Sequence, residues 1–176
     1  MPSASSGAER LDLLRRRYRW LALLVLAAAL QLFESLLPSL GPWFKPGLAN
    51  IGTLLALAML GARAAFSLAL ARVVLGALFL GTLLTPTFLV SLVAALVAAA
   101  VMAALWRLRC GLSPVGISLA GAVAHMATQV AVVETLIVQQ RALFYLLPPL
   151  LLLSTATGWI NGVIAGYIDA RLAAVR

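Results

Sequence analysis

The sequence predicts an all-α integral membrane protein, a bundle of six transmembrane helices with N- and C-termini in the cytoplasm. Hydrophobic residues make up 64% of its 176 residues and charged residues only 10%, whereas a soluble domain is about half apolar and about a quarter charged. The apolar residues also form blocks of roughly the length that crosses a bilayer. A water-soluble core of this size could not hide so much apolar surface.

Six apolar segments, separated by proline, glycine and polar residues, give the expected spans. They cover residues 20–37, 47–61, 64–84, 87–106, 114–138 and 143–168. The second is shorter than the roughly twenty residues needed to cross squarely, so it either starts below the membrane surface or adjoins a loop that dips in. Pro148 and Pro149 are expected to kink the last span in its outer third.

The predicted organisation has three parts. Residues 1–19 form a basic cytoplasmic segment, part of which is expected to be an interfacial helix continuous with the first span. Residues 20–170 form the six-helix transmembrane domain, and residues 171–176 form a cytoplasmic tail. No soluble domain remains outside these segments, so the function is expected within the bilayer, at its surface or through a partner.

The basic residues predict the orientation. The net charge is +8, but the arginines sit at the ends of apolar segments, which indicates contact with anionic lipid and argues against nucleic acid. With the N-terminus in the cytoplasm, ten basic residues lie inside, only Lys45 and Arg141 lie outside, and Arg72 falls within the third span. The positive-inside rule therefore predicts cytoplasmic termini.

Several polar side chains lie within the spans at similar depth. Glu34 is in the outer half of the first span, where a carboxylate costs about 2.5 kcal/mol or more, and Gln31 lies one turn below it. Arg72 is near the midplane of the third span, and His125 and Gln129 share one stripe of the fifth. Such expensive groups suggest a cavity open to the outside.

The expected substrate-binding residues are Gln31, Glu34, Asn50, Arg72, His125 and Gln129. Two structural alternatives stay open. Glu34 and Arg72 could pair merely to neutralise each other. His125 could be a hydrogen-bonded packing residue, because no second histidine or suitable cysteine exists to complete a metal site.

Catalytic signatures are missing from the sequence. It has no P-loop, no nucleophile elbow and no zinc-protease motif, and Asp12 and Asp169, its only aspartates, cannot form the paired boxes that hold magnesium and diphosphate. We therefore expect no enzyme activity, no catalytic residue, no metal site and no cofactor. Residues Ser154, Gly158, Gly162 and Gly166 give the last span a small-residue face, which suits helix packing or docking of another membrane subunit.

Several stretches together resemble one bacterial family. They are FESLLP (33–38), KPGLANIGTLLAL (45–57), RVVLGALFLGTL (72–83), GAVAHMATQ (121–129) and the glycine-rich end of the last span. The family is known as the Gx transporter family or as heptaprenyl diphosphate synthase component I. The resemblance covers about residues 20 to 170 and implies a multi-pass protein of the bacterial cytoplasmic (inner) membrane.

The two family names imply different functions. Proteins of this kind look like the substrate-binding S components of energy-coupling factor transporters. That likeness implies a vitamin-like or precursor substrate, and a separate coupling subunit with ATPases. In such components small residues of the first helix dock the coupling subunit, but here the run Ala27-Ala28-Ala29 departs from a clean Ala-x-x-x-Ala pattern. The synthase name implies instead a non-catalytic membrane subunit in prenyl diphosphate or quinone metabolism.

Overall fold

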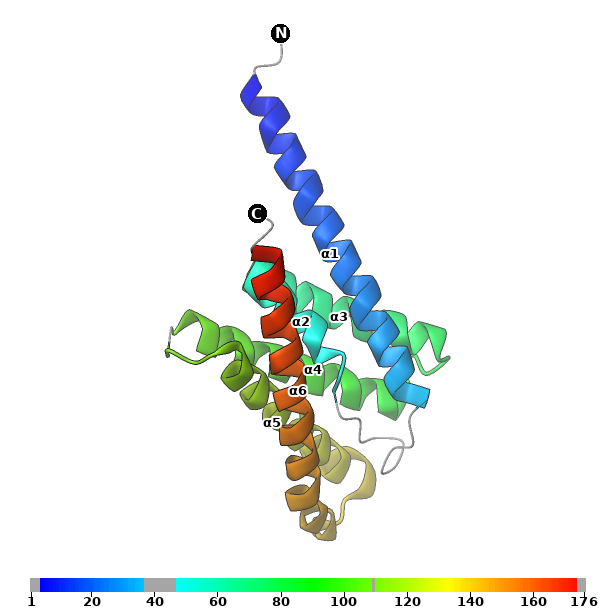
Figure 1. Cartoon of the computed structure of the whole chain (residues 1–176). Helices are drawn as coiled ribbons and strands as arrows, with labels where there is room; N and C mark the ends of the chain where they lie inside the picture. The colour runs from blue at the N-terminus through cyan, green and yellow to red at the C-terminus, as the bar shows by residue number, and fades with distance from the viewer. Residues whose placement is uncertain (1–3, 37–46, 109, 174–176) are drawn as a thin grey trace.

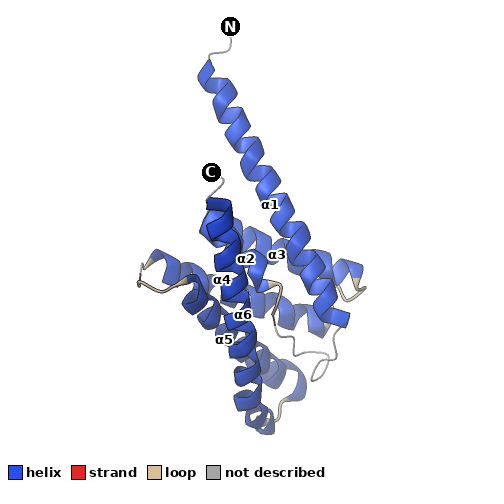
Figure 2. Ribbon diagram, in the orientation of Figure 1, coloured by secondary structure: helices blue, strands red, loops and turns tan. Residues whose placement is uncertain are grey.

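The computed structural model describes residues 4–36, 47–108 and 110–173, and the regular secondary structure in these ranges is helical (Figures 1 and 2). The α-helices are α1 (Ala4–Leu36), α2 (Asn50–Leu60), α3 (Ala62–Phe79), α4 (Pro86–Arg107), α5 (Pro114–Val133) and α6 (Leu147–Ala173). A π-helical turn, η1 (Glu134–Val138), and a 3-10 turn, η2 (Arg141–Leu146), join α5 to α6.

Five of the helical stretches are long and apolar enough to cross a membrane. They are Gly7–Leu36, Ala62–Phe79, Pro86–Arg107, Pro114–Val138 and Arg141–Leu172. The sixth, α2, has 11 residues and covers only about 17 Å of a hydrocarbon core about 30 Å thick. The prediction of six helices is confirmed, but within residues 4–36, 47–108 and 110–173 five helical stretches, and not six, are long enough to span a membrane.

The short helix α2 lies at the centre of the bundle. It packs against α1, α3, α4, α5 and α6, and the residues from Asn50 to Leu57 are all buried. It lies close to α1, where a Cβ added at Gly52 would lie 2.6 Å from the Ala27 side chain. An apolar helix this short and this enclosed needs no direct contact with lipid, which explains how it can be stable without crossing the membrane.

The starts of α4 and α5 follow from their sequences. The Thr85 side chain accepts a hydrogen bond from the backbone N–H of Phe88 at 3.4 Å, and Pro86 occupies the first helical position. Ser113 and Pro114 repeat this arrangement at the start of α5. A hydroxyl cap satisfies a free N–H group, and proline fits where no N–H is needed. These caps fix where the site-bearing helix α5 begins.

Helix α1 is continuous through the basic N-terminal segment and the first apolar block, as predicted. It extends well beyond the rest of the bundle, and the C-terminal end of α6 lies at the same end of the molecule (Figure 1). This arrangement is compatible with two termini on one side of a membrane. Their cytoplasmic location stays a prediction.

The last helix differs from expectation in one respect. Pro148 and Pro149 fall in the first turn of α6, directly after the 3-10 turn η2, and not inside a longer helix that they would kink. Proline lacks the N–H that an interior position must donate, so the α-helix starts beside it. The small-residue face of α6 packs on α5: a Cβ added at Gly162 would lie 2.6 Å from the Val115 Cα.

Candidate functional site

The six residues predicted to bind a substrate come together in the structure. Each is buried, with at most 7% of its surface exposed. Five of them (Gln31, Glu34, Arg72, His125 and Gln129) line one small void together with Gly47, Val73 and Ser91, and Asn50 is hydrogen-bonded to Arg72. We call these nine residues the polar cluster. Its members come from α1, α2, α3, α4 and α5 and from the residue Gly47 before α2.

Arg72 links three helices. Its Nη1 donates a hydrogen bond to Oε1 of Gln31 on α1 at 3.3 Å, and its Nη2 donates to Oδ1 of Asn50 on α2 at 2.8 Å. Glu34 also attracts the guanidinium electrostatically. A buried cation is tolerated only where several polar groups replace its lost hydration, and here amide oxygens and a nearby carboxylate share that task.

Gly47 closes the cluster with its backbone. Its N–H donates to the Glu34 carboxylate, and its carbonyl accepts from Asn161 Nδ2 at 3.2 Å and from the Asn50 N–H at 2.9 Å. Its φ of +82° suits glycine, and a Cβ there would lie 3.2 Å from Asn50 Nδ2 and 3.6 Å from His125 Cδ2. A glycine is therefore needed both for the turn and for the close contact with the cluster.

Hydrogen bonding in the cluster is incomplete. Within the described residues, six buried side-chain atoms have no hydrogen-bond partner: Asn50 Nδ2, Thr53 Oγ1, Arg72 Nε, His125 Nδ1, Gln129 Oε1 and Asn161 Oδ1. Leaving such an atom unpaired costs about 1–3 kcal/mol. Four of these atoms belong to the cluster, while Thr53 and Asn161 lie on the adjoining α2 and α6. The atoms are donors and acceptors in mixture, which suits a polar molecule with both functions.

The void in the cluster is small. Its volume is about 20 Å³, which is room for roughly one water molecule. Among the described residues, the Gly47 backbone and the polar side chains fill the space between the helices, so the expected chamber open to the outside is not seen in that part of the chain. The convergence of the six residues was predictable from sequence, but the packing between them was not. That they bind a substrate stays a prediction.

Four residues in or next to the polar cluster were not among the six predicted site residues: Gly47, Val73, Ser91 and Asn161. Gly47 lies in the quoted KPGLAN stretch, where a proline-glycine pair signals a turn. Ser91 carried no signal, because a lone serine in an apolar helix is common. Asn161 of α6 donates a hydrogen bond to the Gly47 carbonyl. In the described part of the chain, no group of three or more His, Cys, Asp or Glu side chains is placed to hold a metal ion.

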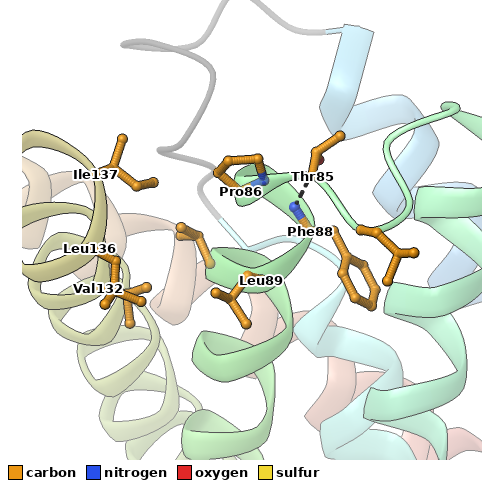
Figure 3. A pocket seen from close by; sticks show the side chains of 9 residues that line it. Thr85, Pro86, Phe88, Leu89, Val132, Leu136 and Ile137 are labelled. Atoms are coloured by element: carbon orange, nitrogen blue, oxygen red, sulfur yellow. Dashed lines mark hydrogen bonds between the residues drawn. The ribbon is translucent and has the colours of Figure 1, made fainter.

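A second, apolar cavity lies between the start of α4 and the C-terminal end of α5 with the adjoining turn η1 (Figure 3). It has a volume of about 520 Å³ and is lined mainly by aliphatic side chains and Phe88. Val132, Leu136 and Ile137 face Pro86 and Leu89 across it in Figure 3. We call it the α4–α5 groove. Its lining suits a hydrocarbon chain and offers few polar contacts.

The model of the family heptaprenyl diphosphate synthase component I matches residues 23–168, most of the chain. The chain belongs to this family. The match runs from within α1 to near the end of α6 and therefore includes every residue of the polar cluster. This member of the heptaprenyl diphosphate synthase component I family is a multi-pass helical membrane protein. No curated protein and no solved structure matches the chain.

Proposed function

We propose that this protein is the substrate-binding membrane subunit of an uptake system for a small, polar, vitamin-like or precursor molecule. It would act without enzyme activity of its own, like the S components that it resembles. A separate membrane coupling subunit and ATPases would supply the energy. The polar cluster would hold the substrate.

One observation carries this proposal: unpaired polar atoms of Asn50, Arg72, His125 and Gln129 are gathered at one buried place. A purely structural network would gain stability by pairing these atoms or by replacing them with apolar groups. A binding site gains from leaving them available, because a ligand then pairs with them. The arrangement therefore favours a site over a set of packing contacts.

Binding requires a change of conformation. Small-molecule sites usually enclose about 300–1,000 Å³, far more than the void of about 20 Å³ in the cluster. The segment at Gly47 is the element that must move, because its backbone contacts Glu34, Asn50 and Asn161 at once. On this reading the structure shows a closed form of the polar cluster.

The test is the small molecule that copurifies with the protein in mild detergent, identified by mass. We expect a bound compound in the wild type and none in a Gln129→Met variant, which removes the unpaired Oε1 but conserves volume. Ser154→Ala is the matched control, because Ser154 is equally buried but bonds within its own helix, to the Leu151 carbonyl. Equal retention in all three proteins, or no compound in any, would contradict the proposal.

A second function is favoured by the α4–α5 groove together with the family description. An apolar groove of about 520 Å³ suits part of an isoprenoid chain, and a non-catalytic membrane subunit could hold that chain for a separate prenyl diphosphate synthase. Prenyl transfer that depends on coexpression of this chain, without loss of uptake when it is deleted, would favour this function over transport. A Leu89→Trp variant, which fills the groove, should then reduce prenyl transfer.

A further inference from the structure

We propose that the groove between the N-terminal part of α1 and the α2–α3 turn binds one anionic phospholipid. We call it the α1 groove. Its charge comes from Arg16 and Arg17, and its apolar surface comes from Leu13, Trp20, Leu21, Leu60 and Ala64. It has a volume of about 390 Å³. This site is independent of the substrate proposed for the polar cluster.

The two arginines of the groove are opposite in charge to a phosphate headgroup. Arg16 and Arg17 are both exposed at the groove, and α1 carries five arginines between residues 10 and 19 against two acidic residues, Glu9 and Asp12. The groove itself contains no carboxylate among its described lining residues. Guanidinium groups bind phosphate oxygens through parallel N–H donors, so two neighbouring arginines can hold one phosphate.

Trp20 gives the groove an apolar surface that is held in a fixed position. The Trp20 indole N–H is within hydrogen-bonding distance of the Ala64 carbonyl (3.3 Å) and of the Ser67 hydroxyl (3.1 Å), both on α3. These bonds fix the ring across the gap between α1 and α3 and leave its apolar faces for contact. Tryptophan is enriched at the level of lipid headgroups. The groove thus has two arginines directly beside its hydrocarbon surface, so a lipid headgroup and part of its chain can be bound together.

The dimensions favour a lipid over a protein partner. The volume is within the range of sites for single small molecules, about 300–1,000 Å³, whereas a specific protein interface buries about 800 Å² on each partner. The groove also lies on the part of α1 that leads out of the bundle, and Figure 1 shows α1 extending beyond the other helices. One headgroup and the adjoining part of an acyl chain fill such a groove, whereas a helix of another subunit would contact mainly its rim.

The experiment is a lipid titration of the full-length protein in mild detergent, followed by native mass spectrometry. Phosphatidylglycerol is the anionic probe and phosphatidylcholine the neutral one. The variant Arg16→Gln/Arg17→Gln should bind phosphatidylglycerol about tenfold to thirtyfold more weakly than the wild type. The control variant Arg15→Gln/Arg19→Gln changes the net charge equally but alters no residue of the groove, and should bind within about threefold of the wild type.

A second variant tests the apolar surface of the groove without changing any charge. Ala64→Leu adds volume inside the groove and should also weaken phosphatidylglycerol binding while the far-ultraviolet helical signal is unchanged. Three results would overturn the proposal. The first is an equal loss of phosphatidylglycerol binding in the two double variants, which would indicate diffuse attraction. The second is equal affinity of the wild type for the two lipids. The third is loss of a copurifying membrane protein from the Arg16→Gln/Arg17→Gln variant while its lipid binding is intact.

Discussion

One substitution, glutamine to methionine, should have opposite effects at two positions of the polar cluster. Gln31 and Gln129 are both buried, with 7% and 1% of their surface exposed. Oε1 of Gln31 accepts a hydrogen bond from Arg72, whereas Oε1 of Gln129 has no partner among the described residues. The comparison isolates the role of the polar atom, because the change in shape is the same at both sites.

The expected magnitudes follow from these contacts. Gln31→Met removes an acceptor from a buried guanidinium, and a hydrogen bond to a charged group contributes about 1.5–3 kcal/mol. Gln129→Met removes an atom whose lack of a partner costs about 1–3 kcal/mol, offset by up to about 1.5 kcal/mol for imperfect packing. We therefore expect Gln31→Met to lower the free energy of unfolding and Gln129→Met to leave it unchanged or raise it. The two variants should differ in free energy of unfolding by at least about 1 kcal/mol.

The assay is denaturant unfolding of both variants in one detergent, followed by the helical circular dichroism signal. Ligand retention is measured on the same preparations. Gln129→Met should be stable yet lose the copurifying compound, which separates a binding role from a folding role. If Gln129→Met were destabilised as much as Gln31→Met, Gln129 would be a member of a structural network, and the proposed site would lose its main support.

Two further predictions concern the charges and the helix packing. Arg72→Met leaves the Glu34 carboxylate buried without the guanidinium and should cost about 3–5 kcal/mol. The double variant Glu34→Gln/Arg72→Met should cost clearly less than the sum of the single changes, and additive losses in a double-mutant cycle would show that the two groups do not interact. Gly162→Ala places a Cβ 2.6 Å from the Val115 Cα and should cost about 1–3 kcal/mol. Gly166→Ala, whose nearest contact would be 3.8 Å away, should be neutral or stabilising by up to about 1 kcal/mol; equal effects in thermal unfolding would contradict close packing of α5 and α6.

The helices and the gathering of polar residues could be predicted from sequence because hydrocarbon imposes a simple constraint. A polar side chain inside a span must face other polar groups or water, so depth along each span sufficed to bring Gln31, Arg72, His125 and Gln129 together. The shortness of residues 47–61 likewise showed that this segment could not cross squarely. The corresponding helix α2 is central and buried.

The partners within the cluster could not be predicted in the same way. Charge alone pairs Glu34 with Arg72, but the hydrogen bonds of Arg72 go to Gln31 and Asn50, and Glu34 accepts from the Gly47 backbone. Depth fixes one coordinate of a side chain, and the rotation of each helix about its axis fixes the rest. That rotation follows from packing among all the helices, which one sequence does not reveal. The size of the void depends on the same packing.

The bonds of Gly47 connect substrate entry to the arrangement of the bundle. Gly47 is held by Glu34 of α1 and Asn161 of α6, and it adjoins Asn50, which α2 contributes to Arg72 of α3. A molecule larger than one water enters the cluster only if Gly47 moves, so it must break the bonds to Glu34 and Asn161. A substrate compensates for this loss only if it offers a donor to the Glu34 carboxylate and an acceptor to the Asn161 amide. The same exchange removes the link that Gly47 forms between α1 and α6.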